Sequence, residues 1–210
     1  MIKISVIITC YNCESYIERT INSIRNQKGN GSLFELEIIA IDDCSPDGTL
    51  KKLNLIKGIR TYSTQKNSGG PNKGRNIGLV ASTGDYICIA DHDDIWHEER
   101  IKTLLPYLNL APIITSGYTL INKTTGKEII RTNSCEQGYI EYKTNETFLK
   151  RLIKSNNGQL TYLGSIIFKS ELKNILFEEH FGMLDYDWLL RLFHNQKTAE
   201  ICRPLYYRYV

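Results

Sequence analysis

The first half of the chain alternates between short apolar runs and segments with helical spacing. β-Branched residues dominate the apolar runs, whereas Ile17, Ile21 and Ile24 recur at the spacing of one helix face. We therefore predict strands over 3–9, 36–41, 59–64 and 85–90, and helices over 14–27, 49–56 and 74–82. This β-α-β-α-β-α-β order predicts an α/β fold, with a mostly parallel central sheet flanked by helices on both faces.

The second half is less regular. Apolar runs on either side of Thr124-Thr125-Gly126 predict a hairpin of residues 112–122 and 127–131. The remaining patterns predict helices over 97–108, 144–154 and 184–195, and strands over 164–169 and 199–209. No linker or repeat separates the two halves, so we expect one domain over residues 1–210.

Composition excludes several classes of protein. The 210 residues carry a net charge of +3, and their basic residues are scattered, which does not indicate a nucleic-acid-binding protein. No apolar run approaches the roughly 20 residues of a membrane span. A weak, peripheral attraction to an anionic membrane surface remains compatible with this charge.

Cysteine occurs six times, with no spacing that suggests a paired framework. Several cysteines fall in strand-like runs, where a free thiol acts as a small buried hydrophobe. Cys10 and Cys13 form a C-x-x-C pattern, but no second pair follows at zinc spacing. We therefore interpret them as packing residues and expect a reducing, cytoplasmic compartment.

Polar clusters follow each of the four strands predicted in the first half. They are Thr9-Cys10-Tyr11-Asn12, Asp42-Asp43, residues 67–76 and Asp91-His92-Asp93-Asp94. In parallel sheets ligands bind at the carboxyl ends of the strands. Four polar clusters at one edge therefore predict a binding site there.

Three carboxylates crowd the last of these clusters. Like charges at this spacing repel, so a hard divalent cation such as Mg²⁺ or Mn²⁺ is the expected partner, and a bare acidic turn is the alternative. If the strand continues, Asp91 and Asp93 point to one face as cation ligands and His92 to the other. Asp94 would cap the following helix or hold its neighbours.

The other clusters offer binding residues, each with a structural alternative. Asp42 suits a base or ribose edge, and otherwise forms part of an Asx turn. The glycine-rich stretch before Arg75 has the spacing of a Walker A loop but lacks its Lys and Ser/Thr, which disfavours a P-loop phosphotransferase. Arg75 could still meet a phosphate, and Tyr11 could stack on a base. Asp185 and Asp187 are either helix caps or general-base candidates.

Five motifs in order resemble family 2 glycosyltransferases, which have the GT-A fold. They are Ser5–Asn12, Ile39–Thr49, Asn67–Leu79, Asp91-His92-Asp93-Asp94-Ile95-Trp96 and Asp185–Leu192, and together they extend over nearly the whole chain. The sequence departs from the family at Leu184, where the family usually has Glu before the base. It also ends at Val210, where relatives usually continue into a loop over the donor; a further segment or a partner subunit would then complete that lid.

The resemblance implies an inverting transfer from a nucleotide-diphosphate sugar, most commonly a UDP-sugar, with Mg²⁺ or Mn²⁺. The acceptor would be a hydroxyl of a glycan, a lipid-linked glycan or a protein, at the inner face of a membrane or elsewhere in the cytoplasm. Residues 1–96 would bind the donor and residues 97–210 would form the acceptor side. The alternative is a non-catalytic nucleotide-sugar-binding subunit of a larger synthase.

The same resemblance implies roles for individual residues. The nucleotide would be held by Thr9, Tyr11 and Asp42, with Asn67 and Arg75 facing the nucleotide or the diphosphate. The ribose and donor sugar would lie by Asp91 and His92, the metal would bind Asp93, and Asp185 would be the base.

Overall fold

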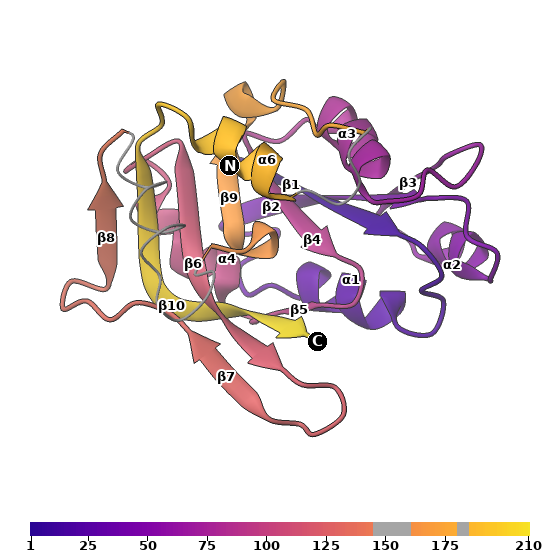
Figure 1. Cartoon of the computed structure of the whole chain (residues 1–210), viewed down its shortest axis with the longest axis horizontal. Helices are drawn as coiled ribbons and strands as arrows, with labels where there is room; N and C mark the ends of the chain where they lie inside the picture. The colour runs from indigo at the N-terminus through magenta and orange to yellow at the C-terminus, as the bar shows by residue number, and fades with distance from the viewer. Residues whose placement is uncertain (145–160, 180–184) are drawn as a thin grey trace.

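A computed structural model of the chain describes residues 1–144, 161–179 and 185–210. One sheet joins the strands, in the order β3-β2-β1-β4-β9-β6-β10-β5, with β7 paired to β6 and β8 to β10 (Figure 1). The strands are β1 (Ile2–Cys10), β2 (Phe34–Asp42), β3 (Arg60–Ser63), β4 (Tyr86–Asp91), β5 (Ile95–Trp96), β6 (Ile113–Ile121), β7 (Glu128–Arg131), β8 (Tyr139–Tyr142), β9 (Ile166–Lys169) and β10 (Thr198–Tyr209). The helices are α1 (Ile17–Arg25), α2 (Thr49–Leu55), α3 (Asn72–Ala81), α4 (Arg100–Leu104) and α6 (Asp185–Phe193), with short 3₁₀ turns η1 (Leu105–Tyr107), η3 (Leu163–Ser165) and η4 (Ser170–Leu172).

The parallel part of the sheet is the N-terminal half, as the sequence predicts. β1 pairs in parallel with both β2 and β4, and β2 pairs in parallel with β3. The second half is mixed, because β9 inserts antiparallel between β4 and β6, whereas β10 runs parallel to β6. The carboxyl ends of β1, β2 and β4 consequently meet at one edge.

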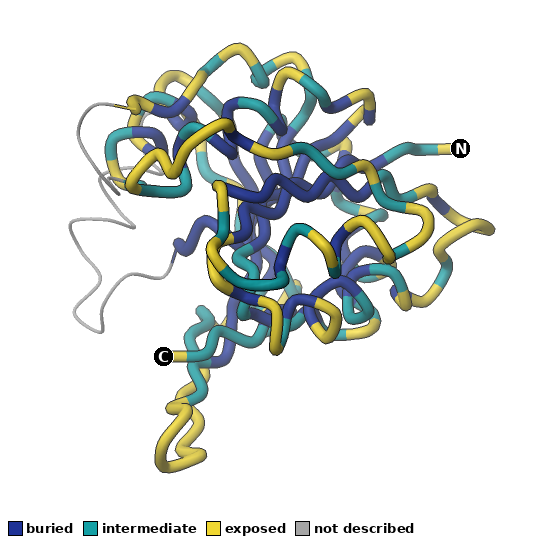
Figure 2. The backbone as a smooth tube through the Cα atoms, turned by 90° about the vertical axis from the view of Figure 1, so that its right-hand side faces the viewer, coloured by how far each residue is buried: buried dark blue, intermediate teal, exposed yellow. Residues whose placement is uncertain are grey.

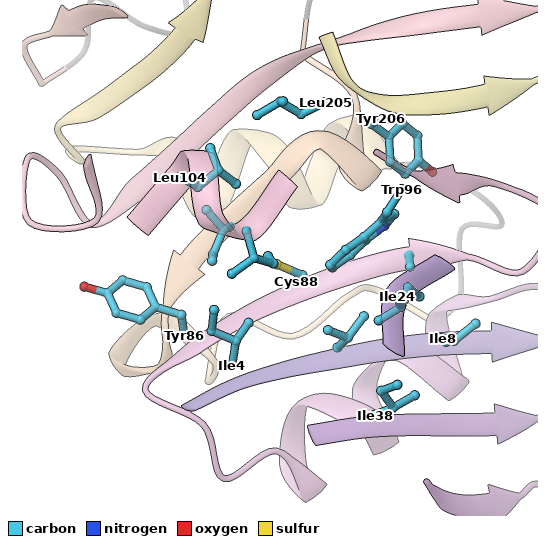
Figure 3. Packing of buried hydrophobic residues seen from close by; sticks show 14 of the residues in the cluster. Ile4, Ile8, Ile24, Ile38, Tyr86, Cys88, Trp96, Leu104, Leu205 and Tyr206 are labelled. Atoms are coloured by element: carbon cyan, nitrogen blue, oxygen red, sulfur yellow. The ribbon is translucent and has the colours of Figure 1, made fainter. Parts of the chain in front are cut away.

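Apolar side chains cover both faces of the sheet. On one face Ile4 and Ile8 of β1 pack with α1, and Figure 3 shows part of this layer, including Ile24 and Trp96. On the other face Ile7 packs with α3 and α6, whose Trp188 is 1% exposed. Figure 2 shows the resulting buried strands inside a shell of exposed loops.

The contact between α3 and the sheet is close because of Gly78. A Cβ atom at this position would lie 2.2 Å from Cγ2 of Ile7. Glycine therefore lets the helix approach β1, and this approach fixes where the N-terminal turn of α3 presents Arg75 to the strand ends.

Most predicted elements of the first half and the β6–β7 hairpin are confirmed. The helix predicted over 97–108 is shorter and continues as η1, because Pro106 has no N–H with which to extend an α-helix. β5 and β8 are additional strands that the sequence pattern does not predict. Almost all of the helix predicted over 144–154, and also Leu184, lie outside the described residues.

One expectation about the cysteines is wrong. Cys135 and Cys202 form a disulfide across 67 residues of sequence, whereas Cys10, Cys13 and Cys88 are free and buried as predicted. Pairing of β8 with β10 brings the two half-cystines together, and that pairing leaves no signal in cysteine spacing. None of the helices that the structure describes has the length and apolarity of a membrane span.

Candidate active site

A cavity of about 660 Å³ opens at the carboxyl ends of β1, β2 and β4. We call it the main cavity. The residues that line it are Thr9, Cys10, Tyr11, Asp43, Asn67, Gly69, Gly70, Pro71, Arg75, Asp91, His92, Asp93, Tyr162, Asp185 and Arg208. The structure therefore brings together all the predicted site residues except Asp42.

Asp42 is the one predicted residue that does not face the main cavity. It is the last residue of β2, paired in register with Cys10, and its side chain is 1% exposed and accepts a hydrogen bond from the Ser45 backbone. Asp43 follows the end of the strand and lines the main cavity instead. The Asp43 carboxylate is fixed by two hydrogen bonds: the Thr64 hydroxyl donates to Oδ1 at 2.8 Å, and the Ser68 backbone N–H donates to Oδ2 at 3.0 Å. Of these two adjacent acids, the structure places Asp43 rather than Asp42 in the wall of the main cavity.

Asn67 and His92 lie in the wall and are held by backbone contacts. The Asn67 amide donates to the carbonyl of Asp43 at 3.2 Å, which joins the glycine-rich loop to the end of β2. Nδ1 of His92 lies 3.1 Å from the carbonyl oxygen of Thr9, and its ring stacks on Tyr16 at 5.7 Å. Both contacts orient polar side chains at the strand ends.

Arg75 supplies the positive charge between the carboxylates. Its side chain is 3% exposed, with Nη1 2.6 Å from Oδ1 of Asp185 and Nη2 3.4 Å from Oδ1 of Asp91. The guanidinium carbon also lies 5.1 Å from the ring centre of Phe177. Arg75 therefore joins the end of β4 to the first residue of α6, two segments far apart in the sequence.

Tyr162, a residue that no sequence motif indicates, holds the other oxygen of Asp91. Its hydroxyl donates to Oδ2 of Asp91, and the guanidinium carbon of Arg208 lies 3.9 Å from the centre of its ring. Burial, followed by the charge of Asp91, raises the pKa of Tyr162 well above its usual range. The phenol therefore stays protonated and remains a donor.

The expected common face of Asp91 and Asp93 is not observed. β4 ends at Asp91 and the chain then turns, so Asp93 points to a different set of partners and pairs with Lys123 at 2.9 Å. Among the described residues, no three His, Cys, Asp or Glu side chains form a group suited to a metal ion. Mg²⁺ is commonly held by one or two carboxylates together with substrate phosphates, which Asp93 fits as a partly exposed wall residue. Asp91 fits less well, because Arg75 and Tyr162 already engage both its oxygens.

Asp94 caps no helix, contrary to one expectation; it holds its neighbours. Its side chain is buried and accepts hydrogen bonds from the hydroxyl of Tyr206 and, at 2.9 Å, from the backbone of Tyr209. Burial, with a contribution from Asp91, raises the pKa of Asp94 to about 7. Asp94 thus attaches the acidic turn to β10.

The second half contributes residues that carry no recognisable motif. Tyr162 precedes η3 and Arg208 lies in β10, so both reach the main cavity only through the mixed part of the sheet. Asp187, the alternative base, does not line the cavity and pairs with Arg191 at 2.7 Å.

Comparisons with known proteins agree with this architecture. The family model of glycosyl transferase family 2 matches residues 5–176. The chain is 35% identical over 116 residues to poly(ribitol-phosphate) beta-N-acetylglucosaminyltransferase TarS of Staphylococcus aureus (strain Mu50 / ATCC 700699), covering 52% of this chain and 19% of that protein. It is 34% identical over 157 residues to an uncharacterized glycosyltransferase of Haemophilus influenzae, covering 73% of this chain and 45% of the relative.

The fold is that of solved GT-A structures. The crystal structure of S. aureus TarS 1–349 in complex with UDP superposes with a TM-score of 0.81 at 23% identity, covering 99% of this chain and 60% of that one. The chain thus spans less than two thirds of the length of each of these relatives. Because the family model covers most of the sequence, the chain belongs to glycosyl transferase family 2.

Proposed function

We propose that the protein transfers a sugar, with inversion, from a UDP-sugar to a hydroxyl group of an acceptor glycan. The observation that carries this proposal is the arrangement around Arg75, where a carboxylate at the end of β4 and a carboxylate on α6 meet in one cavity. An inverting transfer needs one carboxylate beside the acceptor hydroxyl and a polar site for the donor beside it.

Tyr11, Asp43 and Asn67 are the residues that we propose for nucleotide binding. Tyr11 is 45% exposed at the cavity wall, where its ring is available to stack on a base. The Asp43 carboxylate can accept hydrogen bonds from a base or ribose edge. A solved relative with UDP bound supports uracil as the base.

Asp93 is the residue that we propose as metal ligand, with Mg²⁺ or Mn²⁺ completing its coordination from the donor diphosphate. A bound cation would neutralise charge on the leaving diphosphate. Arg208 lines the same cavity, and its guanidinium group is suited to phosphate oxygens. These assignments leave Asp91 to position the donor sugar and ribose.

Asp185 is favoured as the base over Asp187 because it lines the main cavity. Arg75 donates to Oδ1 of Asp185 and so sets the direction of this carboxylate. We assign Oδ2 of Asp185 to accept the proton of the acceptor hydroxyl. A relative named for transfer to poly(ribitol-phosphate) supports a hydroxyl group of a polymer as acceptor. Lipid-linked and protein acceptors, and association with a membrane or a partner subunit, remain part of the proposal.

The experiment is a thermal-shift panel of nucleotide sugars with and without Mn²⁺, followed by measurement of UDP released from the best donor. We expect stabilisation by a UDP-sugar that increases with Mn²⁺, and slow donor hydrolysis by the wild type. Asp185→Asn should bind the donor but lose hydrolysis, whereas the matched variant Asp187→Asn should retain it. Stabilisation without any hydrolysis would favour the non-catalytic subunit, and no stabilisation by any nucleotide sugar would refute donor binding.

A further inference from the structure

Lys123 forms an ion pair with Asp93, the carboxylate that we propose as the metal ligand. Its Nζ atom lies 2.9 Å from Oδ2 of Asp93, and the two side chains are 52% and 29% exposed. Lys123 belongs to neither the family motifs nor the main cavity. Its ammonium group nevertheless contacts the same carboxylate that a divalent cation would use.

The position of this lysine is fixed by its backbone. Its N–H donates to the carbonyl of Val210 at 2.8 Å, and the preceding Asn122 closes the hairpin by accepting from Thr124 and Thr125. Figure 1 shows the loop between β6 and β7 beside the C-terminal end of β10. The stem of Lys123 is thus anchored, whereas its four-carbon side chain stays rotatable.

A second cavity of about 530 Å³ meets the main cavity at Asp93 and is lined by Tyr16, Arg19, Lys123 and Tyr209 among others. Because Lys123 already lines this second cavity, its side chain can turn away from Asp93 while the hairpin backbone stays in place. Exposed ion pairs of this kind are weak and exchange readily. A divalent cation bound together with phosphate oxygens is a stronger partner for the same carboxylate.

We propose that Lys123 competes with the divalent cation for Asp93 and thereby raises the cation concentration that donor binding requires. Without metal, its ammonium group neutralises the carboxylate; Mg²⁺ or Mn²⁺ entering with a diphosphate displaces it into the second cavity. This inference rests on the proposed function, because it takes a diphosphate and a divalent cation as the ligands. It requires that Lys123 opposes metal binding and does not itself hold the diphosphate.

The experiment titrates UDP into the whole chain by calorimetry at a series of Mn²⁺ concentrations. Lys123→Met should lower the Mn²⁺ concentration that gives half-maximal UDP binding by about two- to fivefold, the range expected for loss of an exposed ion pair. Lys127→Met is the matched control, because it removes the same charge from the same hairpin at a lysine without an ion pair among the described contacts. It should leave the Mn²⁺ requirement unchanged, as should Lys123→Arg.

Two results would overturn the inference while the wild type still binds UDP with Mn²⁺. One is an unchanged or higher Mn²⁺ requirement in Lys123→Met. The other is weaker UDP binding by that variant at saturating Mn²⁺, which would make Lys123 a diphosphate contact. Absence of UDP binding by the wild type at any Mn²⁺ concentration would instead refute the proposed function. In that event electron paramagnetic resonance of Mn²⁺ with inorganic pyrophosphate in place of UDP still decides the inference, which predicts tighter Mn²⁺ binding by Lys123→Met and is contradicted by equal binding.

Discussion

Glu37 should make the stability of the fold depend on pH at the edge of the sheet away from the site. Its carboxylate lies in β2, with a side chain 8% exposed, and accepts hydrogen bonds from Ser5, from Thr83 and from Arg60. Burial alone would raise the pKa of Glu37, but these hydrogen bonds lower it from 4.5 to about 2. The ionised side chain therefore ties β1, β2 and the turn before β4 together.

The magnitude follows from this shift. A fall from 4.5 to about 2, at about 1.4 kcal/mol for each pKa unit, makes ionised Glu37 worth on the order of 3 kcal/mol to the folded state. Because the folded pKa is depressed, this stabilisation is present above pH 4.5 and is lost as the pH falls toward 2. Glu37→Gln removes the titrating group. The loss in free energy of unfolding that this substitution causes should therefore be about 2 kcal/mol smaller at pH 3 than at pH 7.

The assay is urea denaturation of wild type and Glu37→Gln at several pH values between 3 and 7. Glu35→Gln is the matched control, since Glu35 is an exposed acid on the same strand. Its difference from wild type should stay nearly constant over this range. A Glu37→Gln difference that is equally large at pH 3 and pH 7 would refute the reasoning.

Three further variants test other parts of the account. Asp185→Asn should keep the Kd for UDP within about threefold while slowing transfer by roughly 10²- to 10⁴-fold, measured by UDP release; unimpaired release would exclude Asp185 as base. Gly78→Ala should lower the free energy of unfolding by about 1–3 kcal/mol in urea, because its Cβ meets Ile7; an unchanged midpoint would contradict the close packing of α3. Tyr162→Phe leaves Asp91 without its phenolic donor and should cost about 1–3 kcal/mol of stability; a neutral result would show that the carboxylate finds another partner.

The parallel half of the fold could be predicted from sequence because each of its elements has a strong local pattern. The β-branched run of β1 and the helical spacing of α1 are examples. β5 could not be predicted, since a strand of two residues shows no periodicity. β8 has no buried residue, so it lacks the apolar face that identifies other strands of its length. The disulfide between Cys135 and Cys202 likewise depends on strand pairing that sequence spacing does not encode.

Site residues could be predicted from sequence where they directly follow a strand. They could not be predicted where the direction of a side chain, or a contact between distant segments, places a residue in the cavity. Asp42 and Asp43 are adjacent, and only the exact end of β2 determines which of them faces the main cavity. The turn after Asp91 redirects Asp93 because the strand stops one residue into the acidic cluster. Tyr162 lies far along the chain in a segment without a motif, so its contact with Asp91 is visible only in the folded structure.

The central claim is that the main cavity binds the nucleotide of a sugar donor, and calorimetric titration of UDP with Mn²⁺ tests it most directly. The account predicts saturable one-to-one binding by the wild type. Asp43→Ala should raise the Kd by about ten- to hundredfold, the expected loss for hydrogen bonds to a charged group. Absence of binding by the wild type, or equal affinity of wild type and Asp43→Ala, would contradict the account.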